Sequence, residues 1–320
     1  ALEKALLVFL GVNFLYYGIA LSNMTATSMS AIGSIAMALL SMSAFAFLSN
    51  HGEISSSMLT VAFVVLLVGS VEFFYHMRSS LLLEGIFDED DGLTNNASVA
   101  FVVLLPWLFL IKNRWIALGG FLVCLFHIVY GAKRGDIVAS VIPVMLFIYS
   151  FARTQKGWWR KLLFVMAIVT VLGLGIWQFF QEDEYLQERL MDTIEGNSSG
   201  RDTIFRNAWE CWYYADDAQF WLGHGFLSTI SLIGKAAHND WLEVLVDYGL
   251  LGVMVYGAIF YFFVRCIRRE HNFSYRMVLL ASLSIWILKS LYSMAYLEAL
   301  WAVLLAPAGI VIGQNRKRLL

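Results

Sequence analysis

Hydrophobic residues follow one another in long stretches along this chain, separated by short polar connections. Each stretch is close to the ~20 apolar residues that a membrane-spanning helix needs. We therefore predict an all-α integral membrane protein with at least ten transmembrane helices, counting ten as a minimum because the first residue is Ala1 and not Met. The ten predicted spans are about 2–21, 28–48, 58–77, 97–111, 115–131, 137–151, 162–180, 248–265, 275–293 and 295–313.

The composition supports this prediction and excludes several classes of protein. Hydrophobic residues make up 59% of the 320 residues and charged residues only 14%, against about 25% charged residues in an average soluble domain. A soluble enzyme, a disordered chain and a nucleic-acid binder are excluded, because none of them can carry so much apolar surface. The net charge of -2 indicates no partner, and three scattered cysteines indicate neither a disulfide framework nor a metal cluster.

The positive-inside rule gives the predicted orientation. Fourteen of the 22 Lys and Arg residues lie in one alternating set of connections, which we place in the cytoplasm. The acidic run 88–91 and the long loop 181–237 then lie outside. This orientation divides the chain into N-terminal transmembrane helices (1–180), a periplasmic loop (181–240) and C-terminal transmembrane helices (241–320).

Five polar residues within the predicted spans share one depth, near the outer face. They are Glu72, His76, His127, Lys289 and Glu298. Charged groups inside a bilayer are costly and usually line a cavity or pair with one another. Their shared depth predicts a polar cavity open to the outer leaflet, and the alternative is side chains that snorkel to the interface and form structural ion pairs.

The long loop 181–237 contains the largest polar segment. Residues 199–202 fit a capping box with Asp202 in place of Glu, and apolar residues from Ile204 to Tyr213 recur at helical spacing. We predict an amphipathic helix on the membrane surface with its aromatic rings at headgroup level. A tight turn at 221–226 follows.

The end of this loop leads into the next predicted span. Asp240 is expected to cap that helix and Glu243 to complete a capping box. This expectation explains both acidic residues but not the preceding His238, and a lone histidine at a loop–helix junction is structural more often than catalytic. The glycines of Gly249-Leu250-Leu251-Gly252 are equally consistent with close helix packing.

These residues resemble a known family. His238-Asn239, nine residues and then Gly249-Leu250-Leu251-Gly252 are similar to the His-Asn-x9-Gly-x-x-Gly pattern of bacterial O-antigen ligases, and O-antigen polymerases carry a related pattern. Residues 199–205 followed by 220–225 resemble the family's Gly-Arg segment and Gly-x-Gly turn. Ala132-Lys133-Arg134-Gly135-Asp136 resembles its Ser-Arg-Gly segment, with Ala132-Lys133 where Ser is more usual. The resemblance covers about 131–260.

The resemblance implies a metal-independent, inverting glycosyltransferase of the GT-C membrane fold, without a cofactor, in the bacterial inner membrane. Its donor is a glycan on undecaprenyl diphosphate, presented at the periplasmic face. The acceptor is another lipid-linked glycan for a polymerase, and lipid A-core for a ligase. Membrane lipid and a chain-length regulator protein are the further partners implied.

The chemistry of this reaction assigns roles to individual residues. Guanidinium groups stabilise a diphosphate leaving group, so Arg134 and Arg201 are candidate catalytic residues, with Lys133 and Arg206 in reserve. A neutral imidazole can remove the acceptor proton, which assigns His238. Glu72, Asp136 and Glu243 are alternative bases or orienting groups. The remaining candidates for binding substrate are Asn239 and Lys289.

Three alternatives stay open from the sequence. A ligase shares the chemistry of the polymerase, which we slightly prefer, and differs in its acceptor. A transporter or flippase of lipid-linked sugars should show two symmetric halves with a midplane site, and no such symmetry is visible. A membrane scaffold has no need of Arg134, Arg201 and His238 on one side of the membrane.

Overall fold

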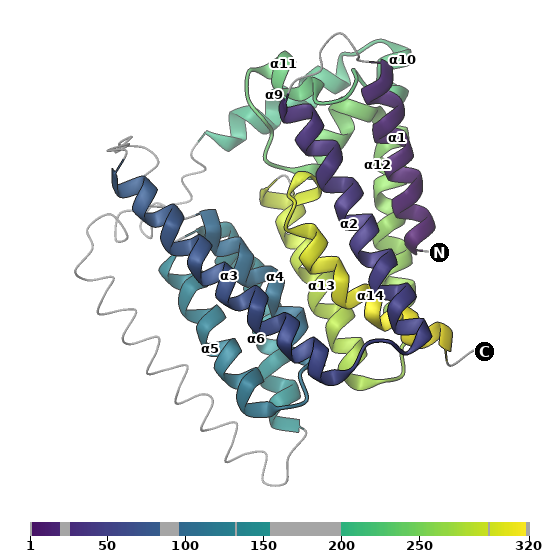
Figure 1. The fold of residues 1–320 in the computed structure, drawn as a ribbon. Helices are drawn as coiled ribbons and strands as arrows, with labels where there is room; N and C mark the ends of the chain where they lie inside the picture. The colour runs from purple at the N-terminus through teal and green to yellow at the C-terminus, as the bar shows by residue number, and fades with distance from the viewer. Residues whose placement is uncertain are drawn as a thin grey trace. The chain divides into compact units, whose positions relative to one another are not determined.

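A computed structural model of the protein describes residues 2–19, 26–83, 96–131, 133–153, 200–293 and 295–317. Every regular element among these residues is a helix, as predicted (Figure 1). Six helices among the described residues are long and apolar enough to cross a membrane, as expected of a multi-pass membrane protein. The predicted spans near 97–111, 115–131 and 295–313 form shorter apolar helices, and the predicted span 162–180 lies outside the described residues. Ten spans and the GT-C fold therefore stay predictions.

The chain forms two compact units, and each unit combines segments that are distant in sequence. The first unit contains Ala1–Glu53, Ser198–His271 and Trp286–Leu320, and the second contains Ile54–Asn197 and Asn272–Ile285. This division is spatial, whereas the division predicted from the sequence follows membrane topology and is not tested by it.

The first unit joins N-terminal, loop and C-terminal helices. Its helices are α1 (Leu2–Ile19), α2 (Ala26–His51), α9 (Arg201–Tyr213), α10 (Asp217–Leu222), α11 (Ser228–Ile233), α12 (Asp240–Arg269), the end of α13 (Phe273–Tyr292), the short 3-10 helix η4 (Ala295–Leu297) and α14 (Trp301–Lys317). The helices α9, α10 and α11 gather where α12 begins (Figure 1).

Small residues bring α2 and α14 together in the first unit. A Cβ atom at Gly309 or Gly313 would lie only 2.2 Å from a backbone oxygen of α2. Ser41 and Ser49 donate hydrogen bonds of 2.7 and 2.8 Å to backbone oxygens of α14. Such close contact is typical of membrane helices, because small side chains allow the two backbones to approach each other.

The second unit has an aromatic core. Its helices are α3 (Ser56–Leu83), the 3-10 helix η2 (Asn96–Ser98), α4 (Val99–Leu104), the 3-10 helix η3 (Leu105–Leu110), α5 (Arg114–Tyr130), α6 (Arg134–Arg153) and the start of α13. Phe74 and Phe101 are fully buried, and the ring of His127 stacks on Phe101 with centroids 4.4 Å apart. His127 therefore belongs to the packed core of this unit.

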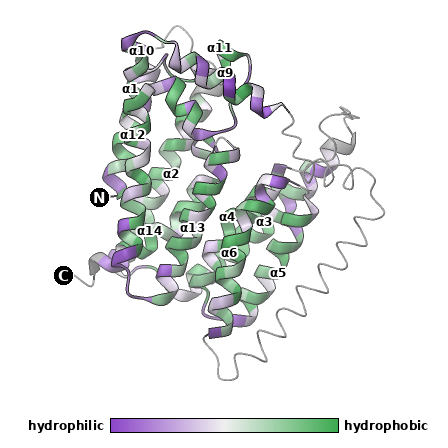
Figure 2. Cartoon of the chain, turned by 180° about the vertical axis from the view of Figure 1, so that it is seen from behind, coloured by the Kyte–Doolittle hydropathy of each residue, from purple (hydrophilic) through white to green (hydrophobic). Residues whose placement is uncertain are grey.

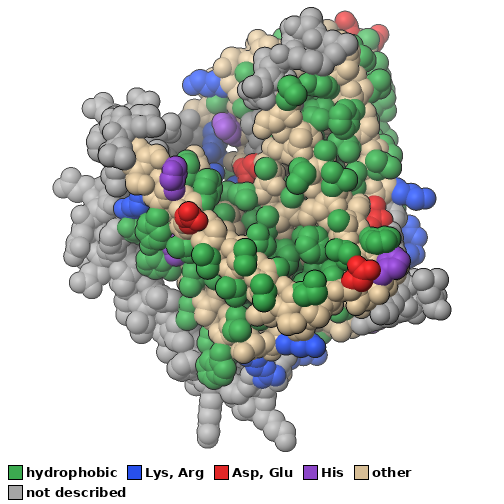
Figure 3. All heavy atoms as spheres, in the orientation of Figure 1, with side chains coloured by type: hydrophobic (Ala, Val, Ile, Leu, Met, Phe, Trp, Pro, Cys, Tyr) green, Lys and Arg blue, Asp and Glu red, His purple; other side chains and the backbone are tan. Residues whose placement is uncertain are grey.

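Large hydrophobic side chains remain exposed along the long helices. On α3, Val61, Val65 and Val68 are each more than 60% exposed. Figure 2 shows hydrophobic residues along most of the length of these helices, with hydrophilic residues concentrated towards helix ends. Hydrophobic side chains also dominate the face of α1 and α2 seen in Figure 3. This distribution is the one that a lipid environment requires.

Candidate functional site

The predicted amphipathic helix exists as α9 and is anchored through one face. Its residues Ala208 and Trp212 pack with Ala237, Leu245 and Val246 in a buried cluster. On the other face, Trp209 is 49% and Tyr213 is 58% exposed. The helix thus carries exposed aromatic rings while its inner face is held on the start of α12.

The predicted capping box of α9 depends on Ser199, which lies outside the described residues. The residue before the helix is Gly200, with φ of 78°, and no side chain of the described residues caps the first turn. A left-handed residue at this position suits glycine, which has no Cβ to clash with the backbone. Arg201 is the first residue of the helix and is half-buried, and Arg206 is exposed on the same helix.

The predicted capping box of α12 is wrong, because Asn239 is the N-cap. The Asn239 side chain accepts hydrogen bonds from the backbone N–H groups of Trp241 (3.0 Å) and Leu242 (3.2 Å). Asp240 is fully buried and instead accepts a hydrogen bond of 2.5 Å from the Tyr256 hydroxyl. Glu243 accepts from the backbone N–H of Ala237. Both acidic residues therefore hold other parts of the unit and do not cap the helix.

His238 lies directly before this cap, at the surface of the first unit. Its φ of 51° places its backbone in the left-handed region, and its side chain is exposed. The amide of Asn239 donates to the backbone oxygen of Leu291 at 3.2 Å, and the indole of Trp241 donates to Ser290 at 3.1 Å. The exposed imidazole of His238 thus lies next to a helix N-terminus that hydrogen bonds to Leu291 and Ser290 hold in place.

The two glycine motifs of the sequence meet backbone to backbone. Gly249 (φ 64°, ψ −164°) forms a kink in α12, and Gly223 has φ of 77° and ψ of −173°. A Cβ at Gly249 would lie 2.5 Å from the Trp221 backbone, and one at Gly223 would lie 2.4 Å from the Asp247 backbone. Gly249 therefore serves the contact with the 221–225 turn, which the expectation of helix packing did not include.

Two hydrogen bonds fix the same turn to α12. The backbone N–H of His224 donates to the backbone oxygen of Val246, and the backbone N–H of Gly225 donates to the backbone oxygen of Asp247, each at 2.9 Å. We call residues 221–229 the docked turn, because these hydrogen bonds hold the segment against α12. Its attachment joins the Gly-x-Gly segment to the helix that begins beside His238.

Asp247 completes this attachment as a buried acceptor. Its carboxylate accepts from the N–H of Leu227 (3.1 Å), the hydroxyl of Ser228 (2.9 Å) and both the N–H (3.0 Å) and the hydroxyl (2.8 Å) of Thr229. Leu227 precedes α11 with a left-handed φ of 55°, and its apolar side chain cannot cap the helix. Asp247 therefore caps α11 from another helix.

We expect Asp247→Ala to lower the free energy of unfolding by about 2–4 kcal/mol, because it leaves buried donors without their acceptor. Asp247→Asn should cost less, since one acceptor oxygen remains for Ser228 and Thr229. Thermal unfolding and limited proteolysis of the docked turn measure both effects. Equal stability of the alanine variant and the wild type would contradict this role.

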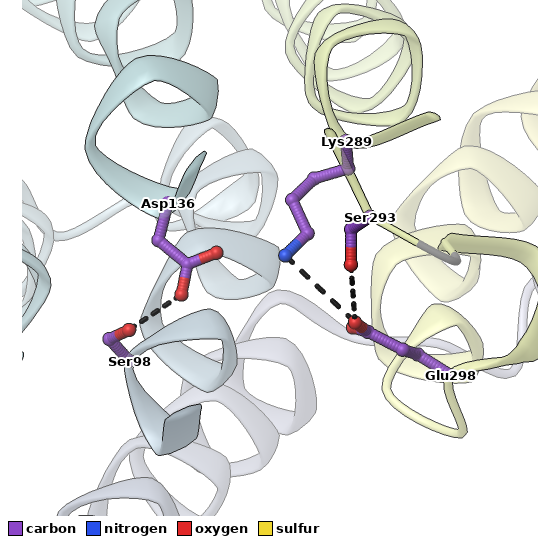
Figure 4. Close-up of polar contacts among 5 residues, drawn as sticks. All are labelled: Ser98, Asp136, Lys289, Ser293 and Glu298. Carbon is purple, nitrogen blue, oxygen red and sulfur yellow. Dashed lines mark hydrogen bonds and ion pairs between the residues drawn. The ribbon is translucent and has the colours of Figure 1, made fainter. Parts of the chain in front are cut away.

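Lys289 is fully buried and forms an ion pair. Its Nζ lies 3.9 Å from Oε1 of Glu298, and the same oxygen accepts a hydrogen bond of 3.1 Å from Ser293 (Figure 4). The structure thus confirms the ion-pair alternative for these two residues. Binding of substrate by Lys289 stays a prediction.

The remaining candidates lie in the second unit. Lys133 and Arg134 stand at the start of α6, and both are half-buried. Asp136 is fully buried and accepts a hydrogen bond of 2.5 Å from Ser98 (Figure 4). Glu72 is exposed on α3. The first unit holds Arg201, Arg206, His238, Asn239 and Lys289, so the expected meeting of Arg134 with Arg201 and His238 stays a prediction, as does the polar cavity.

The spacing of three acidic residues on α12 is a feature of the sequence that the capping-box prediction does not use. Asp240, Glu243 and Asp247 interrupt an apolar run at spacings of three and four, which places them on one helical face. All three are fully buried. The spacing therefore predicts one polar seam, and only its hydrogen-bond partners need the tertiary structure.

Cys211 and His224 form a polar contact beside this seam. The Cys211 sulfur lies 3.8 Å from Nε2 of His224, and burial raises the pKa of the thiol. Across the part of the chain that the structure describes, no group of three or more His, Cys, Asp or Glu side chains could hold a metal ion. Metal independence stays a prediction for a chelator experiment.

Comparison with known proteins adds one finding. Residues 119–257 match a family model described as O-Antigen ligase. No curated protein matches the chain. The matched range contains Arg134, Arg201, His238, the docked turn and Gly249, which is every segment on which the resemblance was based. It supports the O-antigen polymerase and ligase family, and with it a membrane enzyme of polysaccharide or lipopolysaccharide biosynthesis.

Proposed function

From the premise of this family, we propose that the protein transfers a glycan from undecaprenyl diphosphate to a sugar hydroxyl at the periplasmic face of the inner membrane. One observation carries the proposal. The exposed side chain of His238 lies directly before the anchored N-terminus of α12, within the matched range and in the same unit as the half-buried Arg201. A base for the acceptor and a cation for the leaving group are the two groups that this reaction needs.

The leaving group decides the role of the arginines. As the bond between the anomeric carbon and the diphosphate oxygen breaks, the bonding electrons stay on that oxygen. A guanidinium group stabilises this developing charge with two parallel hydrogen bonds and stays protonated. We assign this role to Arg201 and Arg134, with Lys133 and Arg206 as further cations for the phosphates.

The acceptor decides the role of His238. The acceptor oxygen forms the new bond to the anomeric carbon while its proton passes to the neutral imidazole. Attack from the face opposite the leaving group inverts the anomeric centre, with no covalent enzyme intermediate. Asn239, Asp136, Glu72 and Lys289 are proposed to bind the sugars, and a chain-length regulator is a proposed partner.

A reconstituted assay tests the proposal. Purified protein in lipid nanodiscs is incubated with undecaprenyl-diphosphate-linked repeat units, with and without lipid A-core and with and without a chelator. A product ladder without lipid A-core identifies a polymerase. A product only with lipid A-core identifies a ligase, the second candidate, which the description of the matched family favours. The chelator should leave the rate unchanged, and no glycan product in any mixture would contradict a transferase and favour a transporter.

Arg134→Lys tests two-point binding of the diphosphate. We expect at least about a tenfold loss of kcat/KM, because a lysine supplies a point charge and not a planar fork. The matched control is Arg153→Lys at the other end of α6, where the guanidinium lies 4.7 Å from the Phe273 ring centroid. This control should transfer glycan at about the wild-type rate. Wild-type kinetics of Arg134→Lys would show that one positive charge suffices at this position.

A further inference from the structure

The backbone of His238 is held in an unusual conformation. Among the described residues, only His238 and Leu227 combine a side chain with a positive φ. The left-handed region costs a residue with a Cβ about 1–2 kcal/mol. It persists only where neighbouring contacts fix it, so the residues on each side of His238 must supply those contacts.

Asn239 supplies the contact on the C-terminal side. It caps α12 and donates to Leu291, as described above. These bonds define where the helix begins, but they leave the direction of the chain before His238 undetermined. A second anchor is therefore needed on the N-terminal side.

Glu243 is that second anchor. Its own backbone N–H donates to the oxygen of Asn239 at 3.0 Å, so it belongs to the first turn of α12. Its side chain folds back from the helix, and Oε1 accepts the N–H of Ala237, the residue before His238. Glu243 and Ala237 are both fully buried. Without this acceptor, the Ala237 N–H would be buried with no partner, an arrangement that proteins avoid.

We propose that Glu243 is a positioning residue which, by binding the Ala237 N–H, fixes the left-handed conformation of His238 and thereby the place of its imidazole. The proposal rests on the proposed function, in which that imidazole takes the acceptor proton. The carboxylate works as a hydrogen-bond acceptor and does not touch the substrate. The N–H of Ala237 is accepted by Oε1, so one accepting oxygen is sufficient for this contact.

Because one accepting oxygen is sufficient, glutamine is the discriminating substitution. Glu243→Gln keeps one accepting oxygen and removes the charge, whereas Glu243→Ala removes the acceptor. We expect Glu243→Ala to lower kcat by about tenfold to a hundredfold, because a small displacement of a catalytic group costs that much. KM for the lipid-linked donor should stay within about twofold, and Glu243→Gln should recover kcat to within about threefold of wild type.

A second measurement tests the contact between Glu243 and Ala237 independently of enzyme activity. Hydrogen exchange of the backbone amide of Ala237 should be slow in wild type and Glu243→Gln, and faster by about tenfold or more in Glu243→Ala. Thermal unfolding of each variant shows that the protein is folded under the conditions of the assay. The lipid-linked repeat unit is the substrate throughout.

The outcomes separate this proposal from the proposed function. Full activity of His238→Ala would overturn the role of the imidazole, while the exchange rates would still report whether Glu243 holds Ala237. Equal loss of kcat in Glu243→Gln and Glu243→Ala would overturn the positioning role, because the negative charge would then be what matters. Unchanged kcat and unchanged exchange in Glu243→Ala would overturn it as well.

Discussion

Gly249→Ala is expected to abolish glycan transfer and to lower the stability of the first unit by about 2–6 kcal/mol. Two costs add. A φ of 64° with ψ of −164° belongs to a region that only glycine occupies readily, which costs an alanine about 1–3 kcal/mol. The new Cβ would also lie 2.5 Å from the backbone of Trp221, and backbone cannot rotate away as a side chain can, so overpacking adds about 1–3 kcal/mol.

Three further variants separate these two costs. Gly223→Ala has the same combination of positive φ and backbone contact and should behave like Gly249→Ala. Gly234 has φ of 77° and ψ of −7° with open space around it, so Gly234→Ala reports the cost of a left-handed backbone without a steric contact. Gly257 lies on α12 in open space with an ordinary helical φ, and Gly257→Ala should be neutral or slightly stabilising.

Thermal unfolding followed by tryptophan fluorescence, together with the glycan transfer assay, measures these effects. Wild-type activity and stability of Gly249→Ala would show that the docked turn does not need its close contact with α12. Loss of activity in Gly257→Ala would show that α12 tolerates no added methyl group, and the effect at Gly249 would then say nothing about the turn.

His238→Ala is expected to lower kcat by about a hundredfold to ten-thousandfold, which is the range of a lost general base. Arg201→Ala should lower it by about a hundredfold to a thousandfold, through loss of charge stabilisation on the diphosphate. Both side chains lie at the surface of the unit and outside its buried cluster. Their removal should therefore leave membrane insertion and thermal unfolding unchanged.

Matched controls exist in the same unit. His271 and Lys235 are exposed and lie outside the proposed site, and His271→Ala and Lys235→Ala should transfer glycan at the wild-type rate. The readout is the rate of lipid-linked glycan consumption and the length of the product on a gel. If His238→Ala is as active as the His271 control, another group removes the acceptor proton.

The sequence alone determined the class of the protein, an all-helical membrane protein. Long apolar stretches determine membrane helices because lipid leaves a backbone no hydrogen-bond partner except itself. The spacing of apolar residues likewise predicted the helix α9, whereas the packing of Ala208 and Trp212 in the buried cluster came from the structure. The motifs around Arg134, Arg201 and His238 all fall within the range that matches the O-antigen ligase family.

The tertiary structure alone decided what the polar residues within these segments do. Asp240 lies at a helix start, where a cap is the local expectation, but its partner Tyr256 is sixteen residues further along the chain. Gly249 lies against Trp221 and Lys289 pairs with Glu298. A buried polar group needs whichever partner the fold brings within reach, and the helical spacing of the sequence describes faces of a helix, not the neighbours that meet them.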